Sequence, residues 1–345
     1  MAVDFTAVSM LEKPDIADET IITGIQLNYG LTIHHLAFLP LGADVNTAVY
    51  RLHTPEDTLY FLKLRRGPFA EVSIILPRFL HDLGIEQIIA PLPTRAGQLW
   101  TAMEGYTAVL YPFIAGEDGY HVALPDRQWV AFGAALRRVH TAVLPPHILA
   151  HIRRETYPAT FRTAVRGFLA QVNREEPFVD AIAAELAAFL RARQDEIEHL
   201  CRRADDLAHR LQVQPPELTI CHADIHAGNL HITPDGAFFL VDWDEALLAP
   251  KERDLMSIGG GLMGGWRSAA EETAVFYQGY GAVPLNAAAL AYYRYERIIQ
   301  DIAAYCQELL LTAVGGEDRA QSLHYVKSNF APNGTIAQAQ AADAR

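Results

Sequence analysis

The chain has 345 residues, half of them hydrophobic, which is enough for two lobes with sizeable cores. Its formal net charge of −13 at pH 7 argues against a nucleic-acid-binding protein, which needs a basic face, and leaves room for a cationic substrate. No apolar run approaches the roughly 18 residues of a membrane helix. The first residues lack the basic-then-apolar order of a signal peptide, and the three cysteines lie far apart. We therefore expect a cytoplasmic protein with reduced thiols, no membrane segment and no nucleic-acid partner.

Strand patterns dominate the first third of the chain. Short apolar segments joined by polar turns predict strands within 34–42, 48–54, 58–66, 88–94 and 107–116. Residues 67–84 predict one helix that ends at Gly84, with Pro77 as an interior residue able to kink it. This part of the chain is therefore predicted to be a small, mostly antiparallel sheet with one helix.

The pattern becomes helical from about residue 125. Apolar residues at helical spacing predict helices at 126–143, 157–172, 177–212, 270–281 and 286–311. The polar, low-complexity end of the chain is predicted to be flexible. The expected organisation is a β-rich lobe over 1–113, a helical lobe over 114–330 and a flexible tail over 331–345.

The stretch CHADIHAGNLHITPDGAFFLVDWDE, residues 221–245, gathers polar side chains around two short apolar strands. Its Asp235-Gly236 pair is a hairpin-turn signal. A two-residue turn there would set Asn229 opposite Asp242, or within a residue or two of it if the turn is longer. Asp224, on the loop just before the hairpin, can reach the same space.

These residue types suit magnesium-dependent phosphoryl transfer. Amide and carboxylate oxygens are hard ligands, so Asn229 and Asp242 are predicted to bind Mg2+. Asp224 is then free to act as the base that accepts a proton from an attacking hydroxyl. Two alternatives remain open: a loop that only hydrogen-bonds its own turns, or a transition-metal hydrolase. The candidate ligands in that hydrolase are His222, Asp224, His226 and His231.

The first lobe supplies candidate residues for a nucleotide. Lys63 lies among apolar strand residues, where an ammonium group needs a partner, and Glu71 in the following helix is the predicted counter-ion. There is no G-x-x-x-x-G-K-[ST] motif, so the backbone amides around Gly42–Thr47 are the candidate phosphate cover. Backbone groups near the end of the last strand could pair with a purine. The predicted nucleotide-binding residues beside Lys63 and Glu71 are Gly42, Asp44, Asn46, Tyr111 and Phe113.

Four segments together resemble the aminoglycoside phosphotransferase family. They are FLKLRR, LYPFIAG, CHADIHAGNLHI and LVDWDEALLAPKERDLMSIGGG. The resemblance extends over nearly the whole chain and implies an α+β, bilobal protein-kinase-like fold. It also implies ATP (or GTP) and Mg2+ as cofactors, and transfer of the γ-phosphoryl group to an antibiotic hydroxyl, with spectinomycin as the first acceptor to consider.

The resemblance implies roles for individual residues as well. Asp224 matches the catalytic base, Asn229 and Asp242 the metal ligands, and Lys63 the phosphate-binding lysine. The segment from Tyr111 to Phe113 matches the adenine-contacting hinge. Asp254 matches an aspartate that steadies the catalytic loop through backbone hydrogen bonds.

The acceptor is expected to be a small molecule. Only eleven residues separate Asp242 from Asp254, which is too little chain to build a platform for a peptide. Carboxylates with aromatic walls suit a cationic amine sugar. The predicted acceptor contacts are Asp244, Glu245, Trp266, Tyr292, Glu296 and Asp301.

Other functions remain open at this stage. The acceptor could instead be a metabolite such as choline, homoserine or a sugar. The chain could also be a kinase-like binding protein without catalysis, although the intact Lys63, Asp224, Asn229 and Asp242 argue against that. A monomer and a dimer are both compatible with the sequence.

Overall fold

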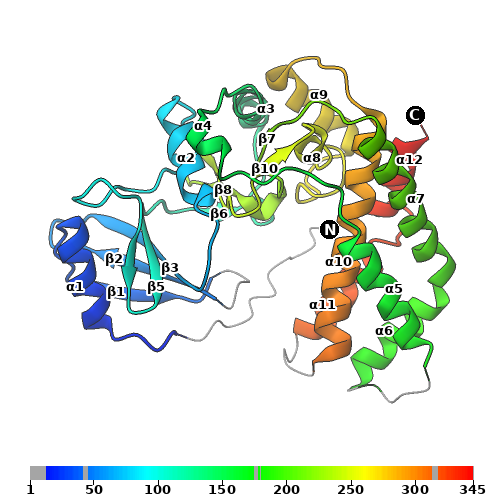
Figure 1. Cartoon of the computed structure of the whole chain (residues 1–345), viewed down its shortest axis with the longest axis horizontal. Coiled ribbons are helices and arrows are strands. Elements are labelled where there is room, and N and C mark those ends of the chain that lie inside the picture. Colours follow the sequence, from blue (N-terminus) through cyan, green and yellow to red (C-terminus); the bar gives the residue numbers. More distant parts are fainter. Residues whose placement is uncertain (1–12, 42–45, 175–177, 179, 313–317, 345) are drawn as a thin grey trace.

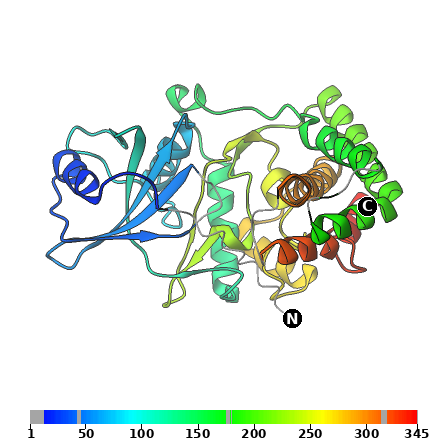
Figure 2. The same cartoon turned by 90° about the horizontal axis from the view of Figure 1, so that it is seen from below.

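The computed structural model describes residues 13–41, 46–174, 178, 180–312 and 318–344. It has two lobes: a β-sheet covered by α1 (Asp18–Tyr29) lies at one end, and a larger, mainly helical part lies at the other (Figures 1 and 2). The predicted α+β, bilobal kinase-like fold is confirmed. None of the described helices is both long and apolar enough to cross a bilayer.

The N-terminal lobe contains a five-stranded antiparallel sheet in the order β1-β2-β3-β5-β4. Alternate residues of its strands, such as Leu62 and Leu64, are fully buried and form the core of this lobe. The strands are β1 (His35–Leu39), β2 (Thr47–His53), β3 (Leu59–Arg66), β4 (Thr101–Met103) and β5 (Tyr106–Pro112).

Helix α1 was not predicted, so the expectation of one helix in this lobe is wrong. Ile21 and Ile25 of α1 are fully buried and belong to the core of the sheet. The helix was missed because it contains an interior glycine, Gly24, and several β-branched residues, all of which lower helix propensity. A Cβ at Gly24 would lie 2.4 Å from the end of the Met103 side chain, so the glycine permits close packing on β4.

Helix α2 (Val72–Asp82) was predicted, with Pro77 inside it and Gly84 beyond its end at φ +82°. Its buried residues Leu76 and Leu80 pack with the core of the helical lobe rather than with the core of the sheet. The apolar face of α2 therefore fixes this helix against the second lobe.

Short strands and closely packed helices surround the loop that carries the candidate site. One small sheet has the order β6-β8-β9, and a second pairs β7 with β10. Helices α3 (Asp126–His140) and α9 (Ala269–Tyr280) pack closely, since a Cβ at Gly279 would lie only 1.8 Å from the Val130 carbonyl oxygen. The strands are β6 (Glu117–Asp118), β7 (Thr219–Cys221), β8 (Leu230–Ile232), β9 (Phe238–Leu240) and β10 (Leu247–Ala249).

The long α10 (Ala287–Leu311) runs through the centre of the helical lobe, and most of its aromatic side chains are buried (Figure 1). The helix predicted over 177–212 is divided at Arg193 into two helices. The break was missed although acidic Asp195 and Glu196 mark a new first turn, where the helix dipole favours negative charge. The remaining helices are α4 (Pro146–Leu149), α5 (Thr160–Val172), α6 (Ala181–Ala192), α7 (Gln194–Val213), α8 (Glu252–Leu255), α11 (Asp318–Ser328) and α12 (Thr335–Asp343).

The prediction of a flexible tail is wrong for α12. Ile336 and Ala339 are buried against the core that includes α10. Asp343 at the end of the helix pairs with Arg203 of α7, with 2.6 Å between the carboxylate and Nε. The low-complexity composition concealed two apolar residues that meet on one helical face.

Replacing Ile336 with alanine should lower the free energy of unfolding by about 2–5 kcal/mol, because the truncation leaves a cavity. Gln340→Ala, at an exposed position of the same helix, should change it by less than about 0.5 kcal/mol. Urea-induced unfolding followed by circular dichroism measures both. Equal stabilities of wild type and Ile336→Ala would contradict the packing of α12.

Candidate active site

The loop between β7 and β8 is held by one buried carboxylate. Asp254 is fully buried, and its two oxygens accept the backbone N–H groups of His222 at 2.9 Å and Ala223 at 2.7 Å. Ala223 has φ +70°, a left-handed conformation that a non-glycine residue adopts at a cost of about 1–3 kcal/mol. The hydrogen bonds to Asp254 thus stabilise a strained loop conformation.

A histidine fixes the charge of Asp254. Its carboxylate lies 2.9 Å from His140 Nε2, and His140 Nδ1 lies 2.7 Å from the Tyr280 hydroxyl. Burial would raise the pKa of Asp254, but the contact with His140 and the backbone N–H groups keeps that pKa below its usual value. Asp254 is therefore an ionised structural anchor beneath the loop.

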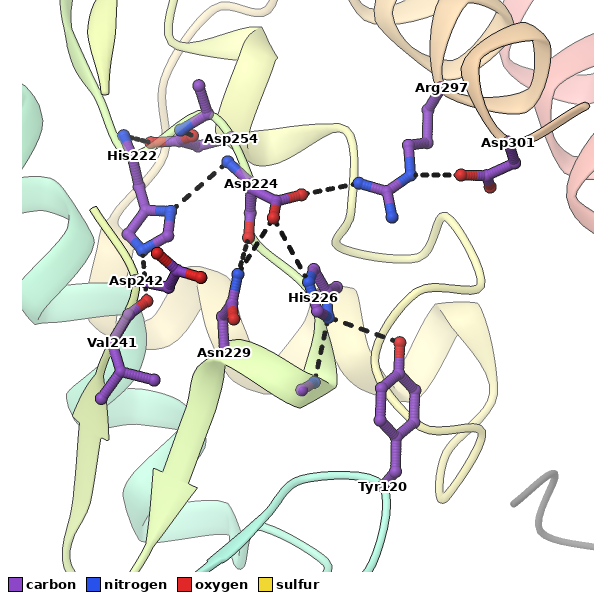
Figure 3. A network of polar contacts seen from close by, with 12 residues as sticks. Tyr120, His222, Asp224, His226, Asn229, Val241, Asp242, Asp254, Arg297 and Asp301 are labelled. Carbon is purple, nitrogen blue, oxygen red and sulfur yellow. Dashed lines mark hydrogen bonds and ion pairs between the residues drawn. The ribbon is translucent and has the colours of Figure 1, made fainter. Parts of the chain in front are cut away.

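The hairpin brings Asn229 within one residue of the position opposite Asp242, as predicted for a turn longer than two residues. Leu230 pairs with Leu240, and the Val241 N–H donates to the Asn229 carbonyl at 3.1 Å, so Asn229 lies opposite Val241. The difference of one residue arises because the loop between Thr233 and Ala237 is longer than a two-residue turn. Asp242 has φ +61°, and Figure 3 shows its side chain beside this loop.

Asp224 lies at the centre of the polar network (Figure 3). Asn229 Nδ2 donates to the Asp224 carbonyl at 2.8 Å and to its Oδ2 at 3.1 Å. Arg297 Nη1 donates to Oδ1 at 2.7 Å, and His226 Nε2 lies 3.4 Å from Oδ2. Burial would raise the pKa of Asp224, but His226 and Arg297 hold it well below the usual range. The carboxylate is therefore ionised at neutral pH.

Two cations of β3 pair with two acids that follow the hairpin. The cations are Lys63 and Arg65, and the acids are Asp242 and Asp244. Lys63 Nζ lies 3.1 Å from Asp244 Oδ2 and 3.8 Å from Asp242 Oδ1. Arg65, on the same face of the strand, donates from Nη1 to Asp244 Oδ1 at 3.2 Å. Burial would raise the pKa of Asp244, but the two cations hold it below the usual range. The two lobes thus meet through opposite charges.

The predicted pair of Lys63 with Glu71 does not form. Glu71 lies just before α2, and its carboxylate is 3.8 Å from His151 Nδ1. The apolar face of α2 packs on the helical lobe, and Glu71 lies beside His151 there. Asp244 takes the place of Glu71 as the carboxylate nearest Lys63.

The other predicted nucleotide-binding residues are only partly described. Gly42 and Asp44 lie outside the described residues. The Asn46 carbonyl accepts a hydrogen bond from the Arg66 N–H at 2.8 Å, where β2 begins beside β3. Tyr111, the next-to-last residue of β5, has its ring 6.4 Å from that of Phe61, and burial raises its pKa. The Phe113 N–H donates to the Leu59 carbonyl at 3.2 Å, so this group is already used within the sheet.

Two predicted acceptor contacts lie inside the helical lobe and cannot reach an acceptor. Tyr292 and Glu296 are buried, and Arg162 of α5 pairs with Glu296. The helix predicted over 286–311 is present as α10, but its face with Tyr292 and Glu296 points into the core, where a buried carboxylate needs a cation. Another face of α10, which carries Arg297 and Asp301, lies toward Asp224 (Figure 3).

The remaining predicted acceptor contacts are dispersed. Asp244 is bound to Lys63 and Arg65 of β3, on the side of the N-terminal lobe. The exposed Glu245 pairs with Arg153 at 3.0 Å, and Trp266 donates from Nε1 to the Gly119 carbonyl at 2.7 Å. Asp301 Oδ1 accepts from Arg297 Nε at 3.0 Å. Only Asp301 therefore lies in the network around Asp224.

The histidines do not form the alternative transition-metal site. His222 Nε2 lies 2.8 Å from the Val241 carbonyl oxygen, and His231 Nε2 lies 2.9 Å from the Ile114 carbonyl oxygen. Both rings therefore donate to the backbone at separate places. Over the described ranges, one triad of potential ligands has its atoms within 4.8 Å of one another, and it consists of the buried His140, Cys221 and Asp254. Its carboxylate already accepts hydrogen bonds from the loop.

A comparison with protein-family models identifies the family of this chain. The model described as "Phosphotransferase enzyme family" matches residues 37–295, which is most of the chain. The chain belongs to the phosphotransferase enzyme family.

Solved structures are similar over nearly the whole length. A spectinomycin phosphotransferase, APH(9)-Ia, in complex with ADP and spectinomycin, is 34% identical, with 96% of this chain and 99% of that chain covered and a TM-score of 0.87. The AMP-bound complex of APH(9)-Ia is 34% identical, covers 94% and 99%, and has a TM-score of 0.82. An aminoglycoside phosphotransferase from Alicyclobacillus acidocaldarius is 15% identical, covers 97% and 96%, has a TM-score of 0.63, and shows the fold alone. The comparison with curated proteins finds no match. The chain is thus a small-molecule phosphotransferase.

A buried acid supports the glycine-rich segment 259–265 of this phosphotransferase. Glu272 of α9 is buried, and its Oε2 accepts the Gly259 N–H at 2.8 Å. Gly259 has φ +63°, a conformation that favours glycine. Burial raises the pKa of Glu272 to about 7. Below about pH 7 the folded protein therefore holds Glu272 mainly in its neutral form.

Glu272→Gln should become more stable relative to wild type as the pH rises. The folded-state pKa of Glu272 lies above its unfolded value of 4.5, so the stability that its proton contributes is lost as the pH rises through about 7. Glutamine keeps an acceptor for Gly259 and does not titrate. The difference in unfolding free energy should shift by about 2–3 kcal/mol between pH 5 and pH 8. Parallel pH profiles of the two proteins in urea unfolding would contradict it.

Proposed function

We propose that this enzyme transfers the γ-phosphoryl group of ATP to a hydroxyl of an aminocyclitol antibiotic, with spectinomycin as the first candidate. The observation that supports it most is the meeting of Lys63 with Asp242 at 3.8 Å, beside the hydrogen-bonded pair of Asp224 and Asn229. Phosphoryl transfer needs just such a base, metal ligands and phosphate-binding cation in one place. The 34% identity to spectinomycin phosphotransferase over 96% of the chain supports the choice of acceptor.

Lys63 and Arg65 are the candidate phosphate-binding cations. Both extend from one face of β3 and are neutralised by Asp242 and Asp244. A triphosphate would offer these cations a stronger set of charged oxygen partners.

Pro112 and Ile114 are the candidates for pairing with the purine. The Phe113 N–H faces β3, and backbone groups alternate in direction along a strand. The Leu110 carbonyl already faces the other side, where it accepts the Leu92 N–H at 2.7 Å. By the same alternation the Pro112 carbonyl and the Ile114 N–H are available to a purine edge, in place of the predicted groups of Tyr111 and Phe113. ATP and GTP present different edges and can be compared directly.

The side chains of Asn229 and Asp242 fit a magnesium ion. Asn229 directs Nδ2 to Asp224, which leaves Oδ1 as a ligand, and the Asp242 side chain is half exposed. One amide and one carboxylate oxygen are the hard donors that Mg2+ takes together with phosphate oxygens and water. When bound, the ion would neutralise charge on the phosphates.

Asp224 would orient the acceptor hydroxyl and take its proton. Because the carboxylate is ionised, it can accept a hydrogen bond from that hydroxyl and aim the oxygen at the γ-phosphorus. The oxygen–phosphorus bond forms as the bond to the leaving ADP breaks, and the proton passes to Asp224.

Asp224→Asn should lower turnover at least about 100-fold, since the amide cannot accept the proton. ADP binding, measured by titration calorimetry, should stay within about threefold of wild type. ADP release is measured with spectinomycin, aminoglycosides, choline, homoserine and sugars as acceptors. Near-normal turnover by the folded variant would refute the role of Asp224, and turnover of a metabolite alone would refute the antibiotic acceptor.

Lys63→Met should raise the KM for ATP about tenfold or more, because charged hydrogen bonds contribute roughly 1.5–3 kcal/mol. Glu71→Gln is the matched control and should change this KM less than about twofold, because Glu71 lies beside His151. Steady-state kinetics at saturating acceptor measures both. A larger effect of Glu71→Gln would show that Glu71 pairs with Lys63 during turnover.

A further inference from the structure

The Asp224 carboxylate has little freedom to accept new hydrogen bonds. Oδ1 accepts from Arg297 at 2.7 Å, and Oδ2 accepts from Asn229 at 3.1 Å and lies 3.4 Å from His226 Nε2 (Figure 3). An ionised carboxylate offers about four acceptor positions. Three are in use, so the one remaining position lies on Oδ1, beside Arg297.

Arg297 is itself held in place before any substrate arrives. Its Nε donates to Asp301 Oδ1 at 3.0 Å while Nη1 donates to Asp224, so the two edges of the guanidinium are fixed by different carboxylates. Asp301 lies one turn further along α10 and keeps the arginine side chain extended. The charge of Asp301, together with that of Asp224, raises the pKa of Arg297 and keeps the guanidinium protonated.

The donor on the other side of Asp224 is oriented in a similar way. His226 Nδ1 accepts the Gly228 N–H at 3.0 Å and lies 3.5 Å from the Tyr120 hydroxyl. Because Nδ1 accepts, the ring proton is on Nε2, which faces Asp224. The Asp224 carboxylate is thus contacted by His226 from its own loop and by Arg297 from α10, two elements far apart in sequence.

We propose that Arg297 is a positioning residue for phosphoryl transfer. Anchored by Asp301, it fixes the plane of the Asp224 carboxylate so that the one remaining acceptor position meets the incoming hydroxyl. This inference rests on the proposed function, since it concerns the orientation of Asp224 during transfer. It also assigns Asp301 to the support of Arg297, in place of the predicted contact with the acceptor.

Arg297→Met tests the positioning role through the division between kcat and KM. It should lower kcat about 10- to 100-fold, because a misplacement of about 1 Å at the reacting group has effects of this size. The KM values for ATP and acceptor should stay within about threefold. Arg297→Lys should recover part of kcat, since an ammonium group can still reach Asp224.

The variant also leaves Asp301 without its cation, which can destabilise the fold. Arg297→Met/Asp301→Asn removes that charge, so it should recover thermal stability without recovering kcat. Arg203→Met is the control, because it removes another arginine–aspartate pair, with Asp343, away from Asp224. Its kcat should equal that of wild type.

Two kinetic outcomes would overturn the inference. One is a folded double variant with the kcat of wild type. The other is a loss in Arg297→Met that falls on the acceptor KM alone, which would make Arg297 an acceptor contact.

Crystal structures of wild type and Arg297→Met, each with ADP, separate this inference from the proposed function. The Asp224 carboxylate should be rotated in the variant, and an unchanged carboxylate would overturn the inference whichever acceptor is used. A wild type that phosphorylates none of the acceptors would overturn the proposed function, whereas the pair of structures would still decide the role of Arg297.

Discussion

The buried carboxylate of Asp254 is the contact on which the rest of the site depends. It binds the backbone of His222 and Ala223, and without it the left-handed Ala223 would relax to an ordinary conformation. The direction of the next residue, Asp224, follows from this strained step. The conformation of the loop that carries Asp224 is therefore set by a fully buried group beneath it.

Ion pairs between residues of the two lobes form near this loop. Lys63 and Arg65 come from the sheet, and Asp242 and Asp244 come from the end of the hairpin. Each cation would be costly to hold alone at a partly buried position, as would a partly buried carboxylate. Their pairing stabilises the contact between the lobes without a nucleotide, and the same charges complement phosphates and a divalent ion. A single arrangement thus serves both stability and the proposed chemistry.

Local features of the site could be predicted from the sequence, and features set by packing could not. The hairpin that carries Asn229 and Asp242 follows from turn chemistry and strand pattern, with the offset of one residue expected for a turn longer than two residues. The pair of Lys63 with Glu71 was inferred from a kinase pattern and fails because α2 packs on the other lobe. No sequence pattern near α2 reveals which lobe its apolar face will meet.

Helix α10 shows the same limit in a sharper form. Its period separates one face with Tyr292 and Glu296 from another with Arg297 and Asp301, but both faces mix aromatic and charged residues. The first is buried because Arg162 of α5, distant in sequence, neutralises Glu296 inside the core. On the second face, Arg297 pairs with Asp224 at 2.7 Å. The partners from other elements, Arg162 for one face and Asp224 for the other, therefore distinguish two faces that are similar in composition.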